Sequence, residues 1–390
     1  AKLYTKRKIL KGSVTRFEQF FNCPFKHFAH YALNLQERKE FRFASPDLGI
    51  LLHAVMHQFG NILIKENRSW QSVSPQECAE ICDKIISTIA PKLQNEILLS
   101  NNRYKHLLKR IRELSILSLN RLIEFSKHSE FKPRALEQSF SLNSSMPPLI
   151  FDDDNGHKIE ITGQIDRIDI TDNYYLVIDY KSGSAFINLL QIYYGLKLQL
   201  LTYLLVAKNS ADALLGNGDA IPAGILYCFL KIPLITSKAK LSTEQLHAEI
   251  DKKLKMPGWV LADPEIIKKI DDSLNFIKVR LNKNKDSISA LSRSYVKTKE
   301  EFDLLLNHIE ALLKEAGKRI LQGEMTIFPY KSKDDTACKY CPYISICRFD
   351  KAIAGYAYNE LKDNDDDTIM EKLRQKEGIS CLGPSNNNEQ

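Results

Sequence analysis

The sequence predicts an α/β protein in which one cluster of strands is surrounded by helices, and two features lead to this prediction. Residues from about 135 to 181 contain apolar, β-branched runs separated by turn signals, which is typical of strands. The segments on either side carry the apolar spacing and the start signals of helices. Because helices and strands do not alternate regularly, we expect an α/β core with added helices and not a doubly wound sheet.

The elements are expected in a definite order along the chain. Helices cover about 13–21, 46–59, 75–100, 103–128 and 188–208, strands fill much of 135–181 and a stretch near 223–230, and residues 240–322 have a helical, charged pattern. The last segment is acidic and then rich in Asn, which favours disorder. We therefore expect one domain over residues 1–360, with a core at about 130–232, helices around it at about 12–128 and 240–330, and a disordered tail over 361–390.

The composition indicates a folded protein and excludes a largely disordered one. Of the 390 residues, 44% are hydrophobic and 26% are charged, which is ordinary for a globular protein. We find no apolar run that approaches the roughly 18 residues of a membrane span. The net charge of +7 is compatible with a polyanionic partner but does not require one. The chain begins at Ala1, which suggests a processed chain or a piece of a longer one.

Two consecutive strands carry the residues of chemical interest. In the run Ile159–Ile170 the apolar positions change parity at Asp166-Arg167, which suggests a bulge or a twist there. The following run, Tyr175–Lys181, is almost wholly apolar up to Asp179, as in a strand that is covered on both faces.

A two-residue hairpin turn at Asp172-Asn173 would place Asp166 opposite Asp179. Opposed residues have Cβ atoms about 4.5–5.5 Å apart, and two carboxylates so close repel unless a cation lies between them. Lys181 lies on the same face as Asp179. The sequence therefore predicts a site for Mg²⁺ or Mn²⁺, which can polarise a phosphoryl oxygen and activate a water molecule. An ion pair on a hairpin without chemistry is the alternative.

Three strings of residues together resemble the RecB-like branch of the PD-(D/E)xK nucleases. They are Gly163–Asp169, Asp179–Gly183 and Gln199–Tyr203, in this order. The resemblance implies a restriction-endonuclease-like core, with a mixed central sheet flanked by helices and with additional helices. An upstream string, Gly49–His53, matches the family's metal-binding histidine.

The resemblance also implies a role for each matching residue. The implied metal ligands are His53, Asp166, Asp179 and the backbone carbonyl of Tyr180. The implied catalytic residues are Asp166, Asp179, Lys181, Gln199 and Tyr203. In that family the Lys assists the nucleophilic water, while the Gln and the Tyr support the site and the nucleic acid. His57 and Glu137 are weaker candidates, since His57 shares a helix face with His53 and Glu137 lies where the family often has an acidic residue.

Cysteines near the C-terminal end have the spacing of metal ligands. Cys338, Cys341 and Cys347 form C-x2-C-x5-C, and Cys23, at a helix break, is the best candidate for a fourth ligand. Four thiolates suit either a structural zinc ion or an iron–sulfur cluster, and the spacing alone does not distinguish them. Of the other cysteines, Cys78 and Cys82 are expected to be packing residues and Cys228 a strand-core residue, while Cys381 falls in the tail.

A lone cysteine followed 315 residues later by C-x2-C-x5-C, with the nuclease strings between, resembles the C-terminal nuclease region of the AddB subunits of bacterial AddAB helicase–nucleases. Arg16–Glu18, Cys23–Phe25 and Gly323–Pro329 agree with it, and the resemblance covers about residues 10–350. It implies that the four cysteines hold a [4Fe-4S] cluster that joins the two ends of the nuclease domain, with zinc as the alternative occupant.

The resemblance implies a Mg²⁺-dependent exonuclease that degrades single-stranded DNA ends in double-strand break repair, in the bacterial cytoplasm. It further implies 5′-to-3′ polarity and an AddA-type helicase–nuclease partner. AddB subunits carry a helicase-like region that this sequence lacks, so the chain is either an excised domain or a stand-alone phage or CRISPR-associated RecB-like exonuclease. A non-catalytic DNA-binding module of the same fold and a zinc-stapled RNA-processing nuclease are further alternatives.

A nuclease of this kind needs basic and aromatic side chains that contact the nucleic acid. The basic candidates are Lys181, Lys197, Arg167, Lys105, Lys109, Arg110 and Arg112. The candidates for stacking on unpaired bases are Tyr193, Tyr194 and Tyr203.

Overall fold

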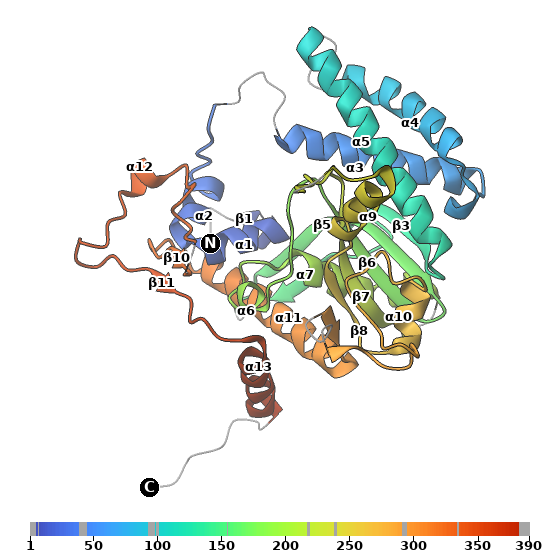
Figure 1. Cartoon of the computed structure of the whole chain (residues 1–390). Coiled ribbons are helices and arrows are strands. Elements are labelled where there is room, and N and C mark those ends of the chain that lie inside the picture. The colour runs from blue at the N-terminus through green and yellow to red at the C-terminus, as the bar shows by residue number, and fades with distance from the viewer. Residues whose placement is uncertain are drawn as a thin grey trace.

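A mixed β-sheet runs through the middle of the molecule, and helices lie against it from both sides (Figure 1). The structure is a computed structural model, and it describes residues 5–6, 8–38, 45–92, 98, 101–153, 155–216, 219–237, 240–290, 295–333 and 335–381.

The strands of the sheet are β1 (Thr5–Lys6), β2 (Ile9–Ser13), β3 (Lys132–Phe140), β4 (Leu149–Asp152), β5 (Lys158–Thr171), β6 (Tyr174–Lys181), β7 (Ile221–Phe229), β8 (Gly258–Leu261) and β9 (Val296–Lys297). Their order is β1-β2-β5-β6-β7-β8-β9, and β3 and β4 also pair with β5. The long strand β5 is the spine of the sheet, because β2 and β4 flank its first half while β3 and β6 flank its second half. The pairing of β6 with β7 is parallel and that of β5 with β6 is antiparallel, so the predicted α/β class with a mixed sheet is confirmed.

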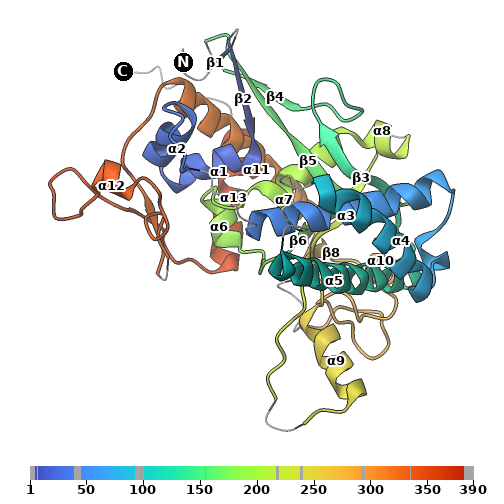
Figure 2. The same ribbon diagram turned by 90° about the horizontal axis from the view of Figure 1, so that it is seen from above.

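The helices are α1 (Val14–Asn22), α2 (Pro24–Tyr31), α3 (Ser45–Lys65), α4 (Pro75–Ile89), α5 (Asn102–Lys127), α6 (Leu189–Tyr193), α7 (Gln199–Asn209), α8 (Ala211–Leu215), α9 (Thr243–Lys253), α10 (Pro264–Ile270), α11 (Lys299–Leu321), α12 (Ile344–Cys347) and α13 (Asp366–Cys381). Helices α7 and α11 pack on β7, whereas α3 contacts β3. Seen from above, α3, α4 and α5 form one group and α1, α2 and α11 form another, with the strands between them (Figure 2).

The sheet extends beyond the core expected at about 130–232. Strand β2 pairs with β5 from the N-terminal side, and β8 and β9 continue the sheet beyond β7, although both lie in the segment that was expected to be helical. These strands have two to five residues each. So short a strand is fixed by its partner in the sheet and leaves almost no periodic signal in the sequence.

The hairpin that joins β5 to β6 has the predicted two-residue turn. Thr171 pairs with Tyr174, and the register continues to Arg167 opposite Ile178. The next positions along this register are Asp166 and Asp179, which the turn length had placed opposite each other.

The bulge expected where the parity of β5 changes lies in the neighbouring strand β3, between Pro133 and Ala135, and the alternative of a twist stays a prediction. The register of β5 against β6 shows no shift along its described pairs. The side chains of Arg167 and Asp169 form a fully buried ion pair, with Arg167 Nε 2.7 Å from Asp169 Oδ1. The guanidinium also lies 4.9 Å from the centre of the Trp70 ring. Strand β5 is therefore buried on both faces at this point, and a charged pair joined by two hydrogen bonds occupies positions where apolar residues were expected.

The helix expected at about 188–208 is two helices. Helix α6 ends at Tyr193 and α7 begins at Gln199, and Gly195 between them has a φ of 77°. A side chain at this glycine would also collide with the ring of Phe21, because a Cβ there would lie 2.4 Å from it. The turn therefore needs a glycine for its conformation and for the close approach of α1.

Helix α3 corrects the expectation that no segment is long and apolar enough for a membrane span. Its residues Pro46–Lys65 reach a mean hydropathy of 1.2 and meet that test by length and composition. However, one face of α3 is at most 1% exposed and belongs to the hydrophobic core; its residues are Leu51, Leu52, Val55, Met56, Phe59 and Leu63. We interpret α3 as a core helix, because an apolar face against the core and polar residues elsewhere are typical of one.

The tail expected to be disordered contains helix α13. Ile369, Met370 and Leu373 are buried in the main hydrophobic core, and α13 contacts α6 and α11. The acidic composition favours disorder, but burial of these three apolar side chains, which lie at helical spacing, stabilises the helix against α11. Residues 382–390 lie outside the described residues.

Candidate active site

An imidazole and two carboxylates meet beside the end of β6, and Asp179 supplies a third carboxylate nearby. Helix α3 supplies His53, β3 supplies Glu137, β5 supplies Asp166, and β6 supplies Asp179. The ligand atoms of His53, Glu137 and Asp166 all lie within 4.8 Å of one another. The Nδ1 atom of His53 is 3.1 Å from Glu137 Oε1 and 3.3 Å from Asp166 Oδ1. Glu137, which the sequence marked only weakly, is thus as close to His53 as the predicted ligand Asp166 is.

The backbone of Tyr180 joins the same group. Its carbonyl oxygen lies 3.1 Å from His53 Nε2, and its N–H donates to Asp166 Oδ2 at 2.7 Å. The predicted ligands His53, Asp166 and Tyr180 are therefore brought together around one point, and β5 and β6 are locked to each other beside it.

Asp179 is buried without enough partners to stabilise its charge. It is 1% exposed, and its Oδ1 atom makes no hydrogen bond within the described part of the chain. Its other oxygen forms an ion pair with the ammonium of Lys181. Burial, followed by the charge of Asp166, raises the pKa of Asp179 to about 7. A buried carboxylate with an open acceptor beside a second carboxylate fits a divalent cation.

His53 behaves as a positive charge among these oxygens. Burial lowers the pKa of His53, but the hydrogen bonds to Asp166 and Glu137 outweigh burial and raise this pKa to about 10. The imidazolium therefore neutralises the carboxylates in the same place where a metal ion would. A metal ion that displaces a proton from the imidazolium of His53 would gain one nitrogen ligand and several oxygen ligands. This set of ligands suits Mn²⁺ as well as Mg²⁺.

The predicted residues Lys181, Gln199 and Tyr203 form a hydrogen-bonded chain beside the carboxylates. Lys181 Nζ donates to Gln199 Oε1 at 3.3 Å, and Gln199 Nε2 donates to the Tyr203 hydroxyl oxygen at 2.8 Å. Tyr203 is 7% exposed, so it supports Gln199 from within the core and is not available for stacking on a base. The chain holds the ammonium of Lys181 close to Asp179.

Glu18 is a site residue for which no role was predicted. Its Oε1 atom accepts hydrogen bonds from the backbone N–H groups of Leu198, at 2.7 Å, and Gln199, at 3.1 Å. Helix α7 has no capping side chain at its own N-cap residue, Leu198, so Glu18 of helix α1 caps it from 180 residues away. Burial raises the pKa of Glu18, while these hydrogen bonds and the nearby Lys197 oppose the increase. The sequence marked Arg16–Glu18 as a string of interest, but it gave no indication that Glu18 caps helix α7.

We expect Glu18→Ala to lower kcat by roughly 10- to 100-fold, because the first turn of α7, which carries Gln199, would lose its cap and shift. KM for the substrate should change much less. Glu18→Gln keeps an oxygen acceptor and should restore most of kcat. Initial rates at saturating substrate would measure both variants. Equal loss in Glu18→Gln and Glu18→Ala would contradict a capping role.

The four predicted cysteines line one small cavity. Cys23 enters it from the junction of α1 and α2, and Cys338, Cys341 and Cys347 enter it from the C-terminal loop around α12. Burial raises the pKa of Cys23 and of Cys338, and the neighbouring thiols raise both further. In contrast, Cys78, Cys82 and Cys228 are buried elsewhere in the core, as expected of packing residues.

Several predicted DNA contacts are engaged elsewhere. Arg167 is fully buried with Asp169 and cannot reach a ligand at the surface. Arg112 forms an ion pair with Asp83, whereas Lys105, Lys109 and Arg110 are exposed on α5.

The tyrosines differ in the same way. Tyr193 stacks on His308, with ring centroids 5.4 Å apart, and Tyr194 packs against the small cluster that contains Cys23. Of the basic candidates, Lys181 and Lys197 line a cavity beside the site.

Comparison with known proteins identifies the family of the chain. The family model described as the PD-(D/E)XK nuclease superfamily matches residues 11–348. The chain is 38% identical over 376 residues to the B-type subunit of the ATP-dependent helicase/deoxyribonuclease of Alkaliphilus metalliredigens, in an alignment that covers 94% of this chain and 32% of the relative. It is 37% identical over 381 residues to the protein of the same name from Bacillus thuringiensis, covering 95% of this chain and 32% of the relative. The chain thus spans about a third of the length of these curated relatives.

Proposed function

The chain belongs to the PD-(D/E)XK nuclease superfamily, and from this premise we propose that it is a metal-dependent deoxyribonuclease that hydrolyses phosphodiester bonds at single-stranded DNA ends. The observation that carries the proposal is the pair Asp166 and Asp179, buried side by side with an open carboxylate oxygen and with Lys181 alongside. A pair of this kind is unfavourable in a fold that does not use it.

The residues present fit a divalent ion, which would be held by Asp166, Asp179, the Tyr180 carbonyl and His53, with Glu137 next to His53. When bound, the ion would polarise the phosphoryl group and acidify a water molecule. Lys181 then orients that water and stabilises negative charge on the phosphate. Gln199 fixes the position of the ammonium, and Glu18 fixes Gln199.

We further propose that this chain is the nuclease domain of a helicase–nuclease subunit that acts with an AddA-type partner in double-strand break repair, with 5′-to-3′ polarity. The similarity to proteins named as B-type subunits of a helicase/deoxyribonuclease supports this assignment. A stand-alone RecB-like exonuclease would use the same site.

The direct test uses single-stranded and duplex DNA that carries a label at the 5′ end or the 3′ end. We expect cleavage that requires Mg²⁺ or Mn²⁺, stops in EDTA and is faster on single strands. Mononucleotides or short products from one end would identify an exonuclease, and the label that is released first gives the polarity. Binding without cleavage in either metal would contradict the proposal and leave a non-catalytic DNA-binding module.

We also propose that Cys23, Cys338, Cys341 and Cys347 hold a [4Fe-4S] cluster. Their shared cavity supports a common ligand. Four thiols around one cavity fit either a [4Fe-4S] cluster or a tetrahedral zinc ion. Bringing residues so distant in the chain together costs roughly 5 kcal/mol of loop-closure entropy. Bonds from the four thiols to a common ligand would offset this cost.

The protein purified without oxygen should therefore be brown, with iron and sulfide in about equal amounts and little zinc. Cys338→Ser should remove the colour and lower Tm, because the link between the two ends of the chain is lost. Cys78→Ser, which alters a buried thiol outside the cavity, should keep the iron. Iron, sulfide and zinc analysis together with thermal denaturation would measure these effects. A colourless protein with one zinc would contradict the cluster.

A further inference from the structure

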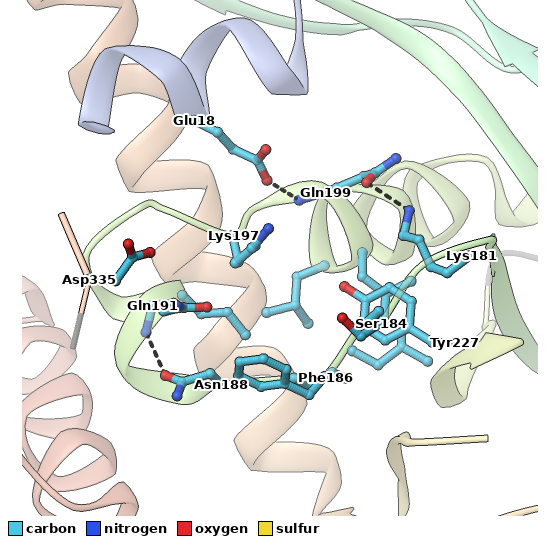
Figure 3. Close-up of a pocket in the computed structure, with 16 residues that line it drawn as sticks. Glu18, Lys181, Ser184, Phe186, Asn188, Gln191, Lys197, Gln199, Tyr227 and Asp335 are labelled. Atoms are coloured by element: carbon cyan, nitrogen blue, oxygen red, sulfur yellow. Dashed lines mark hydrogen bonds between the residues drawn. The ribbon is translucent and has the colours of Figure 1, made fainter. Parts of the chain in front are cut away.

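A cavity of about 420 Å³ opens next to the hydrogen-bonded chain of Lys181 and Gln199. Figure 3 shows Lys181 and Gln199 on one side of it, and Phe186 and Asn188 on the opposite side. The loop that leads from β6 into α6 carries Phe186 and Asn188, so the cavity begins just after the D-x-K string ends. Its volume lies in the range of small-molecule sites in proteins, which is about 300–1,000 Å³.

The walls of the cavity combine an aromatic ring, ammonium groups and an apolar floor. Phe186 is 61% exposed. Lys197 is also exposed, whereas Leu200 and Ile225 are buried and form part of the floor. An exposed ring near cationic side chains is the arrangement by which proteins hold unpaired nucleotides.

The polar groups of the cavity are distributed unevenly. Lys181, Lys197 and the carboxylate of Glu18 lie toward the side of Gln199, whereas Asp335 lies at the far end, beyond Lys197 (Figure 3). The Glu18 carboxylate accepts hydrogen bonds from the backbone N–H groups of Leu198 and Gln199. The end nearest the catalytic residues therefore offers two ammonium groups to a phosphate, whereas Asp335 repels a phosphate from the far end. Gln191 also lines the cavity, and its side-chain oxygen is buried and makes no hydrogen bond within the described chain. A buried acceptor without a partner is unfavourable, and an amino group of a bound base would satisfy it.

Resting on the proposed nuclease function, we propose that this cavity is a subsite for one unpaired nucleotide next to the scissile phosphate. The base stacks on Phe186, and the edge of the base faces Gln191. The phosphate group on the side of this nucleotide that faces the catalytic residues lies against Lys197. A paired base cannot enter, because its partner strand would have to follow it into the cavity. The subsite therefore selects single strands, and the metal-binding group at the adjacent end performs the chemistry.

The variant Phe186→Ala tests this subsite without disturbing the core, since the ring is mostly exposed. In fluorescence anisotropy with a labelled thymidine oligonucleotide and Ca²⁺ in place of Mg²⁺, we expect Phe186→Ala to bind roughly 10-fold or more weakly. The matched control is Leu142→Ala, because Leu142 is 59% exposed on the turn after β3. This control should bind like the parent chain, and duplex DNA should not distinguish the three proteins.

A set of oligonucleotides with a single abasic nucleotide, moved one position at a time, identifies the base. In the parent chain one position should show a loss of affinity that disappears in Phe186→Ala. The same loss in both proteins, or equal binding by Phe186→Ala and Leu142→Ala, would overturn the subsite. Metal-dependent cleavage by the parent chain is measured separately. If the parent chain cleaves DNA but no abasic position lowers its affinity, the subsite is rejected and the nuclease function is not. If the parent chain does not cleave DNA at all, the proposed nuclease function is rejected.

Discussion

Asp179→Asn is expected to abolish metal-dependent cleavage while leaving the fold at least as stable as that of the parent chain. The substitution removes one charge from a site that needs two carboxylates for a divalent ion, so we expect a loss of at least about 1,000-fold in kcat. Stability should move in the other direction. The folded-state pKa of Asp179, about 7, lies above its ordinary value of 3.8. Ionisation of this group therefore weakens the fold as the pH rises through about 7.

The stability advantage of Asp179→Asn should thus be present above pH 7 and absent below about pH 4. Thermal denaturation at several pH values would measure it, and initial rates with Mg²⁺ and Mn²⁺ would measure activity. Mn²⁺ should raise Tm of the parent chain but not of the variant, because only the parent binds it tightly. The matched control is Asp172→Asn in the turn of the same hairpin, which should retain activity. A variant that still cleaves, or a variant much less stable than the parent at pH 8, would contradict this account of Asp179.

The second large effect is expected from Asp169→Asn, this time on stability. Asp169 and Arg167 are both fully buried and pair through two hydrogen bonds of 2.7 Å. Removing one partner leaves an uncompensated charge in the core, so we expect a loss of about 3–5 kcal/mol in the free energy of unfolding. The double variant Arg167→Met, Asp169→Leu removes both charges and should recover most of that loss.

Chemical denaturation of the parent chain, the single variant and the double variant would give these free energies. Lys208→Ala, which removes an exposed ion pair with Asp303, is the control and should change stability by less than about 1 kcal/mol. A double variant as unstable as Asp169→Asn would mean that Arg167 acts through its contact with Trp70 and not through its charge.

Local patterns were sufficient to predict the part of the fold that carries the site. The two-residue turn fixed the register of β5 on β6, and with it the proximity of Asp166 and Asp179. The expected bulge lies in β3 and not in β5, because a parity count registers apolar residues and cannot recognise a buried Arg–Asp pair. Strands β8 and β9 and helix α13 depend on partners distant in the chain, so their own residues provided little indication of them.

The proximity of the candidate site residues was predicted in part. The hairpin register predicted that Asp166, Asp179 and Lys181 lie together, whereas His53 and Gln199 were implied by the resemblance to a family, and their roles stay predictions. Glu18 could not be assigned, because its role depends on a backbone N–H group 180 residues away. Phe186 lies in a loop without periodicity, and its position at a cavity follows only from the fold.

The stacking of Arg167 on Trp70 gives the protein an internal optical reporter. The chain has two tryptophans, Trp70 and Trp259, and both are less than 5% exposed. The guanidinium of Arg167 lies 4.9 Å from the centre of the Trp70 ring, and Arg167 is the immediate neighbour of Asp166 in β5. A Trp259→Phe variant would leave one fluorophore, and we expect its emission to change on addition of Mn²⁺ if the ion binds at Asp166.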